Sequence, residues 1–376
     1  MADEALPSTQ DSGVEEEDTD AAIDTPFNPE GIDITTRATT VNLLLSRLRT
    51  GRLDLEPEFQ RGRVWNPRRK SRLIESLLLN IPLPTIYAAE SKDGEDTWIV
   101  VDGVQRLSTI ASFVHPKNFP DPEIAVLQEL EYLTSHEGLS YAELNERLRT
   151  RIDETEFVVN LIRRGTPETV MFNIFARINT GGQPLTRQEL RHALTPGPAR
   201  TFLKDLAWSP EFVAATGGRV KDDRMEAREM VLRFLAFHMR GVDSYDTSTD
   251  FDGFLSAAMH DLSAVSAAKR KALTRSFVTS LRTATAVFGE HAFRKSLPGD
   301  ERKAPINKAL FETVMSSLAS LSSADHKALI GRRKRALSRF AALLKDEEFR
   351  ASISQGTGDA RKVHLRHLRV EQALQP

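Results

Sequence analysis

The chain has 376 residues, of which 40% are hydrophobic and 28% are charged, and its formal net charge is −2. This is the composition of a globular protein with room for more than one core-forming unit. The absence of cysteine excludes disulfides, thiolate zinc sites and cysteine nucleophiles. No apolar run is long enough to span a membrane and the acidic N-terminus is unlike a signal peptide, so we expect a cytoplasmic protein with no membrane partner.

Acidic residues are concentrated at the N-terminus. Residues 1–36 contain eleven Asp and Glu and no Lys or Arg, which leaves a net charge of +9 on the rest of the chain. We expect residues 1–30, which hold few large apolar side chains, to be a disordered acidic tail. A basic body suits a protein that meets polyanions such as DNA, and a tail that only improves solubility explains the same distribution equally well.

We expect the ordered chain to be α+β, with a small mixed α/β unit at residues 31–183 and an all-helical unit at residues 184–376. In the first unit, apolar spacing and turn residues predict an ordered start near 32–40, helices at 40–48 and from Pro67 to Pro82, and a hairpin of strands at 85–89 and 98–101. The same signals predict a helix at 107–114, a helical charged region at 121–150, a strand at 156–162 and a helix at 167–178. This order indicates a small α+β unit and not a Rossmann sheet.

Nearly every segment after Pro184 has helical spacing. We expect helices at 186–194, 199–206, 222–240, 250–261, 267–287, 305–320 and 324–346, with a looser end to residue 376. Thr186 and Glu189 have the spacing of a capping box at the start of the first of these helices.

Two short motifs each place a Gln-Arg pair beside a turn. Gln60-Arg61 lies within Pro57–Trp65, and Gln105-Arg106 ends the motif Val100–Arg106. In the second motif, Asp102-Gly103 closes an apolar run just before helical spacing begins. Glycine allows close backbone approach, a helix start offers unpaired N–H groups, and arginine binds phosphate oxygens bidentately. The pattern predicts a phosphate site, and a plain Asp-Gly turn after a strand is the structural alternative.

The order of the motifs resembles the ParB/sulfiredoxin-like domain that opens the GmrSD-type (type IV) restriction proteins. The similarity spans roughly residues 35–240. It rests on segments that follow one another in the family's order: Pro57–Trp65, Leu73–Leu78, Ile81–Pro84, Asp102–Arg106 and Phe175–Leu190.

The resemblance implies nucleoside triphosphate hydrolysis that regulates a DNA nuclease. It makes Asp102 the residue that holds magnesium or polarises water, Gln105 the residue that orients the nucleophile, and Arg106 the residue that stabilises transition-state charge. The nucleotide-binding set that it implies is Gln60, Arg61, Gly103, Arg106 and Asn179. Val104 stands where the family usually has a glutamine, which puts turnover in doubt more than binding.

Two basic clusters are candidates for contacts with DNA phosphates. One lies at the start of the helix that follows Pro67 and consists of Arg68, Arg69 and Lys70. The other is the run Arg332, Arg333, Lys334 and Arg335. A solvated helix face is the alternative for each.

Three functions compete. The first is a nucleotide-binding, hydrolysing component of a bacterial anti-phage or restriction system, which acts as a switch for DNA binding or for a partner nuclease. The second is an adaptor that senses nucleotide or DNA through the same pocket without turnover. The third, direct DNA cleavage, is the least favoured, because the sequence has no carboxylate or histidine cluster typical of two-metal cutting. Any nuclease is therefore expected to be a separate polypeptide.

Overall fold

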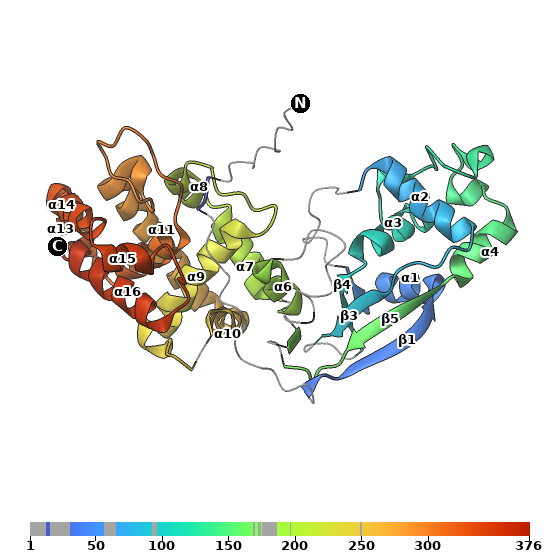
Figure 1. Ribbon diagram of the computed structural model, residues 1–376, viewed down its shortest axis with the longest axis horizontal. Coiled ribbons are helices and arrows are strands. Elements are labelled where there is room, and N and C mark those ends of the chain that lie inside the picture. The colour runs from blue at the N-terminus through green and yellow to red at the C-terminus, as the bar shows by residue number, and fades with distance from the viewer. Residues whose placement is uncertain are drawn as a thin grey trace, which may run out of the picture. The chain divides into compact units, whose positions relative to one another are not determined.

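The computed structural model describes residues 13–15, 31–55, 65–91, 96–167, 170–171, 174, 186–195, 197–248 and 250–376. The described residues divide into two compact units (Figure 1). One lies between residues 26 and 196, and the other comprises Gly197–Pro376 together with the short segment Gly13–Glu15. The chain is thus α+β, with one mixed unit and one helical unit.

A five-stranded mixed sheet forms the centre of the first unit. Its strands lie in the order β1 (Ile34–Thr40), β5 (Glu156–Ile162), β3 (Ile86–Glu90), β4 (Trp98–Asp102) and β2 (Leu53–Asp54). β1 is antiparallel to β5, β5 is parallel to β3, β3 is antiparallel to β4, and β4 is parallel to β2. The expected hairpin is therefore confirmed as β3–β4, and the expected strand at 156–162 as β5.

Both faces of this sheet are covered. Successive residues of β4 point to opposite sides of the sheet, and each side packs into a core of its own. Trp98 and Val100 join the larger core, which also receives side chains from α1 (Val41–Arg49), α2 (Pro67–Leu78), α3 (Val104–Val114) and α4 (Glu146–Glu154). Ile99 and Val101 join a smaller core with Leu190 and Leu194 of α6 (Arg187–Leu194). β4 is thus the buried centre of the unit.

The local signals for α1, α2 and α6 act as expected. The side chain of Thr40 caps α1 by accepting from the N–H of Leu43, and that of Asn66 caps α2 by accepting from the N–H of Arg69. Pro67 follows at the first position of α2, where its missing N–H removes no helical bond. Thr186 and Glu189 form the expected capping box.

The prediction of a helical region at 121–150 is wrong. Only α4, which starts at Glu146, is an α-helix there, and the preceding chain holds 3-10 turns at Pro122–Ile124, Thr134–His136 and Tyr141–Glu143. Side chains of α2 hold this chain in place. The carboxylate of Glu75 accepts the backbone N–H groups of Glu131, Tyr132 and Leu133 at 2.7–3.1 Å. These tertiary bonds satisfy N–H groups that a helix would have used, so the local helical spacing is overridden.

The second unit is built from helices around one large core (Figure 1). They are α7 (Pro198–Ala207), α8 (Pro210–Thr216), α9 (Glu226–Arg240), α10 (Phe251–Ala264), α11 (Ala267–Phe288), α12 (Lys308–Ala319), α13 (Ser323–Gly331), α14 (Arg333–Leu343), α15 (Glu347–Ser352) and α16 (Ala360–Leu374). The single helix expected at 324–346 is two helices that meet at Arg332. The looser end expected after it is α15 and α16, and α16 buries Val363, Val370 and Leu374 in the core.

Part of the segment expected to be disordered belongs to this second unit. Val14 pairs with Ile306 in a β-bridge and is 6% exposed. The carboxylate of Glu15 lies 2.5 Å from the ammonium of Lys295 and accepts from the amide of Asn307 at 2.9 Å. One apolar side chain and one ion pair thus anchor Gly13–Glu15. Among the described residues, no helix combines the length and the apolar character needed to cross a membrane.

Candidate functional site

The junction between β4 and α3 is a left-handed turn at Gly103. Asp102 is the last residue of β4, and Gly103 precedes α3 with φ of +99°. A Cβ atom at Gly103 would lie 3.0 Å from Cγ1 of the buried Ile86 and 3.4 Å from Nη2 of Arg106. Both the backbone conformation and the close packing therefore require glycine here.

Arg106 lies in the first turn of α3 and is 9% exposed. Its guanidinium donates from Nη1 to the carbonyl of Pro84, and from Nη2 to the carbonyl of Thr85 at 3.0 Å and to Oδ2 of Asp102 at 2.8 Å. Burial lowers the pKa of Arg106, and the charge of Asp102 and its hydrogen bond oppose that shift. The acid that an arginine at a helix N-terminus needs as a partner is therefore Asp102 itself.

These bonds fix the shape of the junction. They tie the start of α3 to the end of β4 and to the chain that enters β3, and they use three of the five N–H groups of the Arg106 guanidinium. The Asp102 side chain keeps 35% of its surface exposed. The α3 N-terminus has no side-chain cap, so its first backbone N–H groups and the Asp102 carboxylate form a polar corner at the end of β4.

The two residues between Gly103 and Arg106 differ in their surroundings. Val104 is half-buried and packs against the larger core. Gln105 is also half-buried, and its carbonyl accepts from the hydroxyl of Ser108 at 3.2 Å. Val104 therefore fits its site as an apolar side chain, whereas Gln105 supplies the amide of the motif.

The other three residues that the resemblance assigns to nucleotide binding, Gln60, Arg61 and Asn179, lie outside the described residues. The elements on either side of them contact β4 or α3. β2, which precedes Gln60, is the parallel neighbour of β4, and α2, which follows Arg61, packs on α3. α6, which follows Asn179, packs on β4. The motif segments are thus connected to elements that pack on β4 or on α3.

The basic residues at the start of α2 have three different environments. Lys70 is 3% exposed, and its ammonium contacts Asp121 at 2.5 Å and Glu123 at 2.9 Å. Its charge is used inside the unit, so we remove it from the candidate DNA contacts. Arg69 lies over the Trp65 ring at 4.5 Å, and Arg68 is exposed and 3.8 Å from Glu129. These two remain at the surface.

The second basic cluster is more open. Arg332, Arg333, Lys334 and Arg335 are all exposed at the α13–α14 junction. Within the described part of the chain none of them has an ion pair. Their charges are therefore available to an anionic partner.

Sequence reasoning missed a buried polar group on α6. Gln188, Arg191 and His192 are at most 2% exposed, and Nη1 of Arg191 donates to Oε1 of Gln188. Alternating charge along a short helix is typical of a surface helix, and only the packing of α6 on the second face of the sheet shows that these side chains are buried.

No group of three or more His, Asp or Glu side chains placed to hold a metal occurs among the described residues. Magnesium in nucleotide sites commonly uses one or two carboxylates and completes its shell with phosphate oxygens and water. The partly exposed Asp102 fits that limited role, with one of its oxygens already bonded to Arg106.

The comparisons with known proteins concern this same unit. Residues 41–195 match the family model described as the GmrSD restriction endonuclease, N-terminal domain. Searches of the curated proteins and of the solved structures returned no significant match.

Proposed function

We propose, from the match of residues 41–195 to the family model of the GmrSD restriction endonuclease N-terminal domain, that the chain is a restriction or anti-phage component that binds a nucleoside triphosphate and hydrolyses it. Hydrolysis then acts as a switch for DNA binding or for a separate nuclease subunit. The family match supports the link to restriction. The nucleotide chemistry is what the resemblance of the motifs implies, and the geometry of the β4–α3 junction supports it.

The observation that carries the proposal is the Asp102–Arg106 pair at the uncapped start of α3. A helix N-terminus attracts phosphate through its free N–H groups and its dipole. The pair places a carboxylate and a guanidinium 2.8 Å apart at that point. A strand end, a left-handed glycine and a helix start together provide the close backbone approach that a phosphate needs.

We propose the following division of roles. Gly103 and the α3 N–H groups approach the phosphates, and the N–H groups of Arg106 not used by Pro84, Thr85 and Asp102 bind phosphate oxygens. Asp102 holds the magnesium that accompanies the nucleotide, and that ion neutralises phosphate charge. Gln105 orients the attacking water. Gln60, Arg61 and Asn179 complete the binding set.

Binding without turnover is the second candidate, and Val104 favours it. The side chain packs against the core, so it provides no amide that could position water where the family usually has one. In that case the protein is an adaptor that reports nucleotide or DNA through the same pocket.

The test is phosphate release from each of the four ribonucleoside triphosphates with magnesium, with and without duplex DNA. The variants are Arg106→Lys, which keeps the charge but not the fork, and Asp102→Asn. Arg147→Gln, an exposed arginine of α4, is the matched control. We expect both motif variants to lose turnover and the control to keep it. Unchanged turnover in Arg106→Lys contradicts the assigned site.

Thermal stabilisation by nucleotide separates the two candidates. The adaptor proposal is correct if the wild type releases no phosphate but is stabilised by a triphosphate, and if Arg106→Lys is not stabilised by it. Val104→Gln then tests the cause, since it restores the family's amide. Turnover that appears only in Val104→Gln identifies the missing amide as the reason for inactivity.

A further inference from the structure

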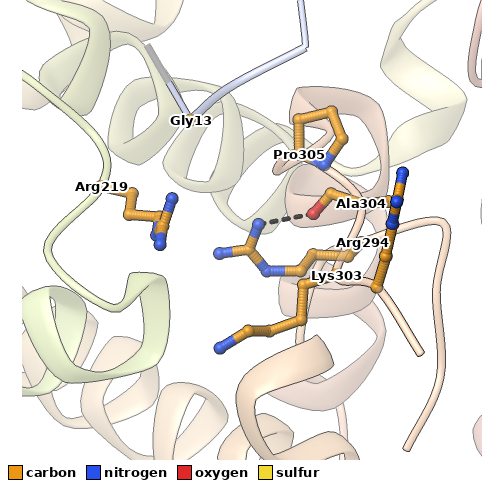
Figure 2. A pocket seen from close by; sticks show the side chains of 7 residues that line it. Gly13, Arg219, Arg294, Lys303, Ala304 and Pro305 are labelled. Atoms are coloured by element: carbon orange, nitrogen blue, oxygen red, sulfur yellow. Dashed lines mark hydrogen bonds between the residues drawn. The ribbon is translucent and has the colours of Figure 1, made fainter. Parts of the chain in front are cut away.

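A pocket of about 450 Å³ in the helical unit is lined by four cationic side chains. They are Arg219, Arg294, Arg302 and Lys303, and the backbone of Gly13 forms part of the same wall. Figure 2 shows the guanidinium groups of Arg219 and Arg294 directed toward each other across the opening, with Lys303 below them. None of these residues belongs to the motifs of the first unit.

Arg294 is the fixed part of this pocket. It is 6% exposed, and its guanidinium donates to the carbonyl of Glu290 at 3.1 Å and to that of Ala304 at 2.6 Å. Carbonyl groups hold its orientation but do not cancel its charge. Burial lowers the pKa of Arg294, the positive charge of Arg219 lowers it further, and the negative charge of Glu290 opposes the shift. The fold thus brings the positive charge of Arg219 close to the buried guanidinium of Arg294.

The nearby carboxylates neutralise only part of the pocket. Glu290 pairs at 2.5 Å with Lys303, one of the four cations, and its charge also acts on Arg294. Glu15, the acid next to the Gly13–Val14 segment, is bonded to Lys295 and Asn307 instead. Among the described residues, no carboxylate forms an ion pair with Arg219, Arg294 or Arg302. Three guanidinium groups of the pocket therefore have no ion-pair partner within the described chain.

The N-terminal segment Gly13–Glu15 forms one wall of the pocket through Gly13. A Cβ at Gly13, which has φ of +70°, would lie 2.7 Å from Cβ of Arg219. Glycine lets the segment pass directly beside Arg219. Because Val14 and Glu15 anchor the segment to Ile306 and Lys295, this wall is part of the folded unit.

We propose that this pocket binds phosphate groups. Guanidinium is the cation best suited to phosphate because its planar fork donates two parallel hydrogen bonds to two oxygens. A phosphate dianion also carries more charge than a single carboxylate, which suits a pocket lined by three guanidinium groups. The volume is sufficient for a diphosphate or for one step of a nucleic-acid backbone. This site is separate from the proposed nucleotide site, and either can fail without the other.

The experiment uses the full chain with two probes, inorganic pyrophosphate and a 20-base-pair DNA duplex. Arg219→Gln and Arg302→Gln remove one exposed charge each, and Arg275→Gln removes another exposed charge, on α11, as the matched control. Pyrophosphate binding is measured by calorimetry at constant ionic strength. We expect each pocket variant to weaken it about tenfold, the loss of one charge-assisted hydrogen bond, and the control to leave it unchanged.

The DNA arm identifies the source of the phosphate. If the backbone occupies the pocket, each variant reduces the slope of log affinity against log salt by about one, and the control does so less. If only pyrophosphate binding falls, the ligand is a free phosphoanion. No binding of either probe, or equal losses in Arg275→Gln and the two pocket variants, overturns the proposal.

Discussion

The two left-handed glycines Gly103 and Gly138 provide a direct test of the β4–α3 junction. Both lie in the first unit, with φ of +99° and +80°. A Cβ at Gly138 meets nothing within 4 Å, whereas one at Gly103 lies 3.0 Å from Ile86. Replacing each by alanine therefore applies a similar backbone strain but adds a steric clash only at Gly103.

The difference between the two variants isolates that clash. A non-glycine residue at positive φ costs about 1–3 kcal/mol, and the lower conformational entropy of the unfolded chain returns about 0.4–1 kcal/mol in both variants. Ile86 is 1% exposed and cannot move into solvent. Overpacking of a buried site adds about 1–3 kcal/mol. We thus expect Gly103→Ala to destabilise the unit by about 1–3 kcal/mol more than Gly138→Ala.

Hydrogen exchange is the appropriate assay, because a chain of two units need not unfold in one step. The peptide that covers β4 and α3, residues 98–114, reports the local opening free energy in the full-length protein. Nucleotide stabilisation is measured on the same samples. If Gly103→Ala costs no more than Gly138→Ala, the close approach to Ile86 does not explain the glycine.

Three further predictions concern charges that hold the fold. Glu312→Gln removes the carboxylate that is bonded to Arg366, and both side chains are 0% exposed. Because a buried charge then loses its partner, we expect the free energy of unfolding of the helical unit, measured in urea, to fall by about 3–5 kcal/mol. A loss under 1 kcal/mol contradicts this. Burial raises the pKa of Glu75, but bonds from Leu133, Glu131 and Tyr132 and the charge of Arg72 outweigh it and leave the pKa lowered. Its contribution is therefore complete above its ordinary pKa and is lost as the pH falls through the lowered value, and Glu75→Gln is expected to remove this acid-dependent part of the exchange protection at 131–133. Lys70→Met is expected to reduce stability but leave the salt dependence of DNA binding unchanged, because Lys70 is paired with Asp121 and Glu123; a reduced salt slope returns Lys70 to the DNA-binding set.

Sequence predicted those elements whose signals are local. The Asn66-Pro67 start of α2, the capping box of α6 and the β3–β4 hairpin depend on residues within a few positions of one another, and all three are confirmed. The region at 121–150 failed because its hydrogen bonds come from α2, more than fifty residues earlier. Local spacing contains no information on such partners.

The candidate site shows the same limit. The sequence placed Asp102, Gly103 and Arg106 at a strand-to-helix junction, and the structure has them there. It did not show that Arg106 is buried or that the carbonyls of Pro84 and Thr85 accept from it. Nor did it indicate the pocket around Arg294, whose cations are contributed by chain segments some eighty residues apart.

The two cationic sites differ in what a phosphate has to displace. Arg106 already has a carboxylate at 2.8 Å, so a triphosphate that takes its remaining N–H groups brings negative charge next to Asp102. Like charges at that distance repel unless a cation lies between them. Magnesium relieves this repulsion, which is why nucleotide binding at the junction is expected to depend on the metal. Within the described chain no carboxylate forms an ion pair with Arg219 or Arg294. An anion there lowers the repulsion between the two guanidinium groups without any metal.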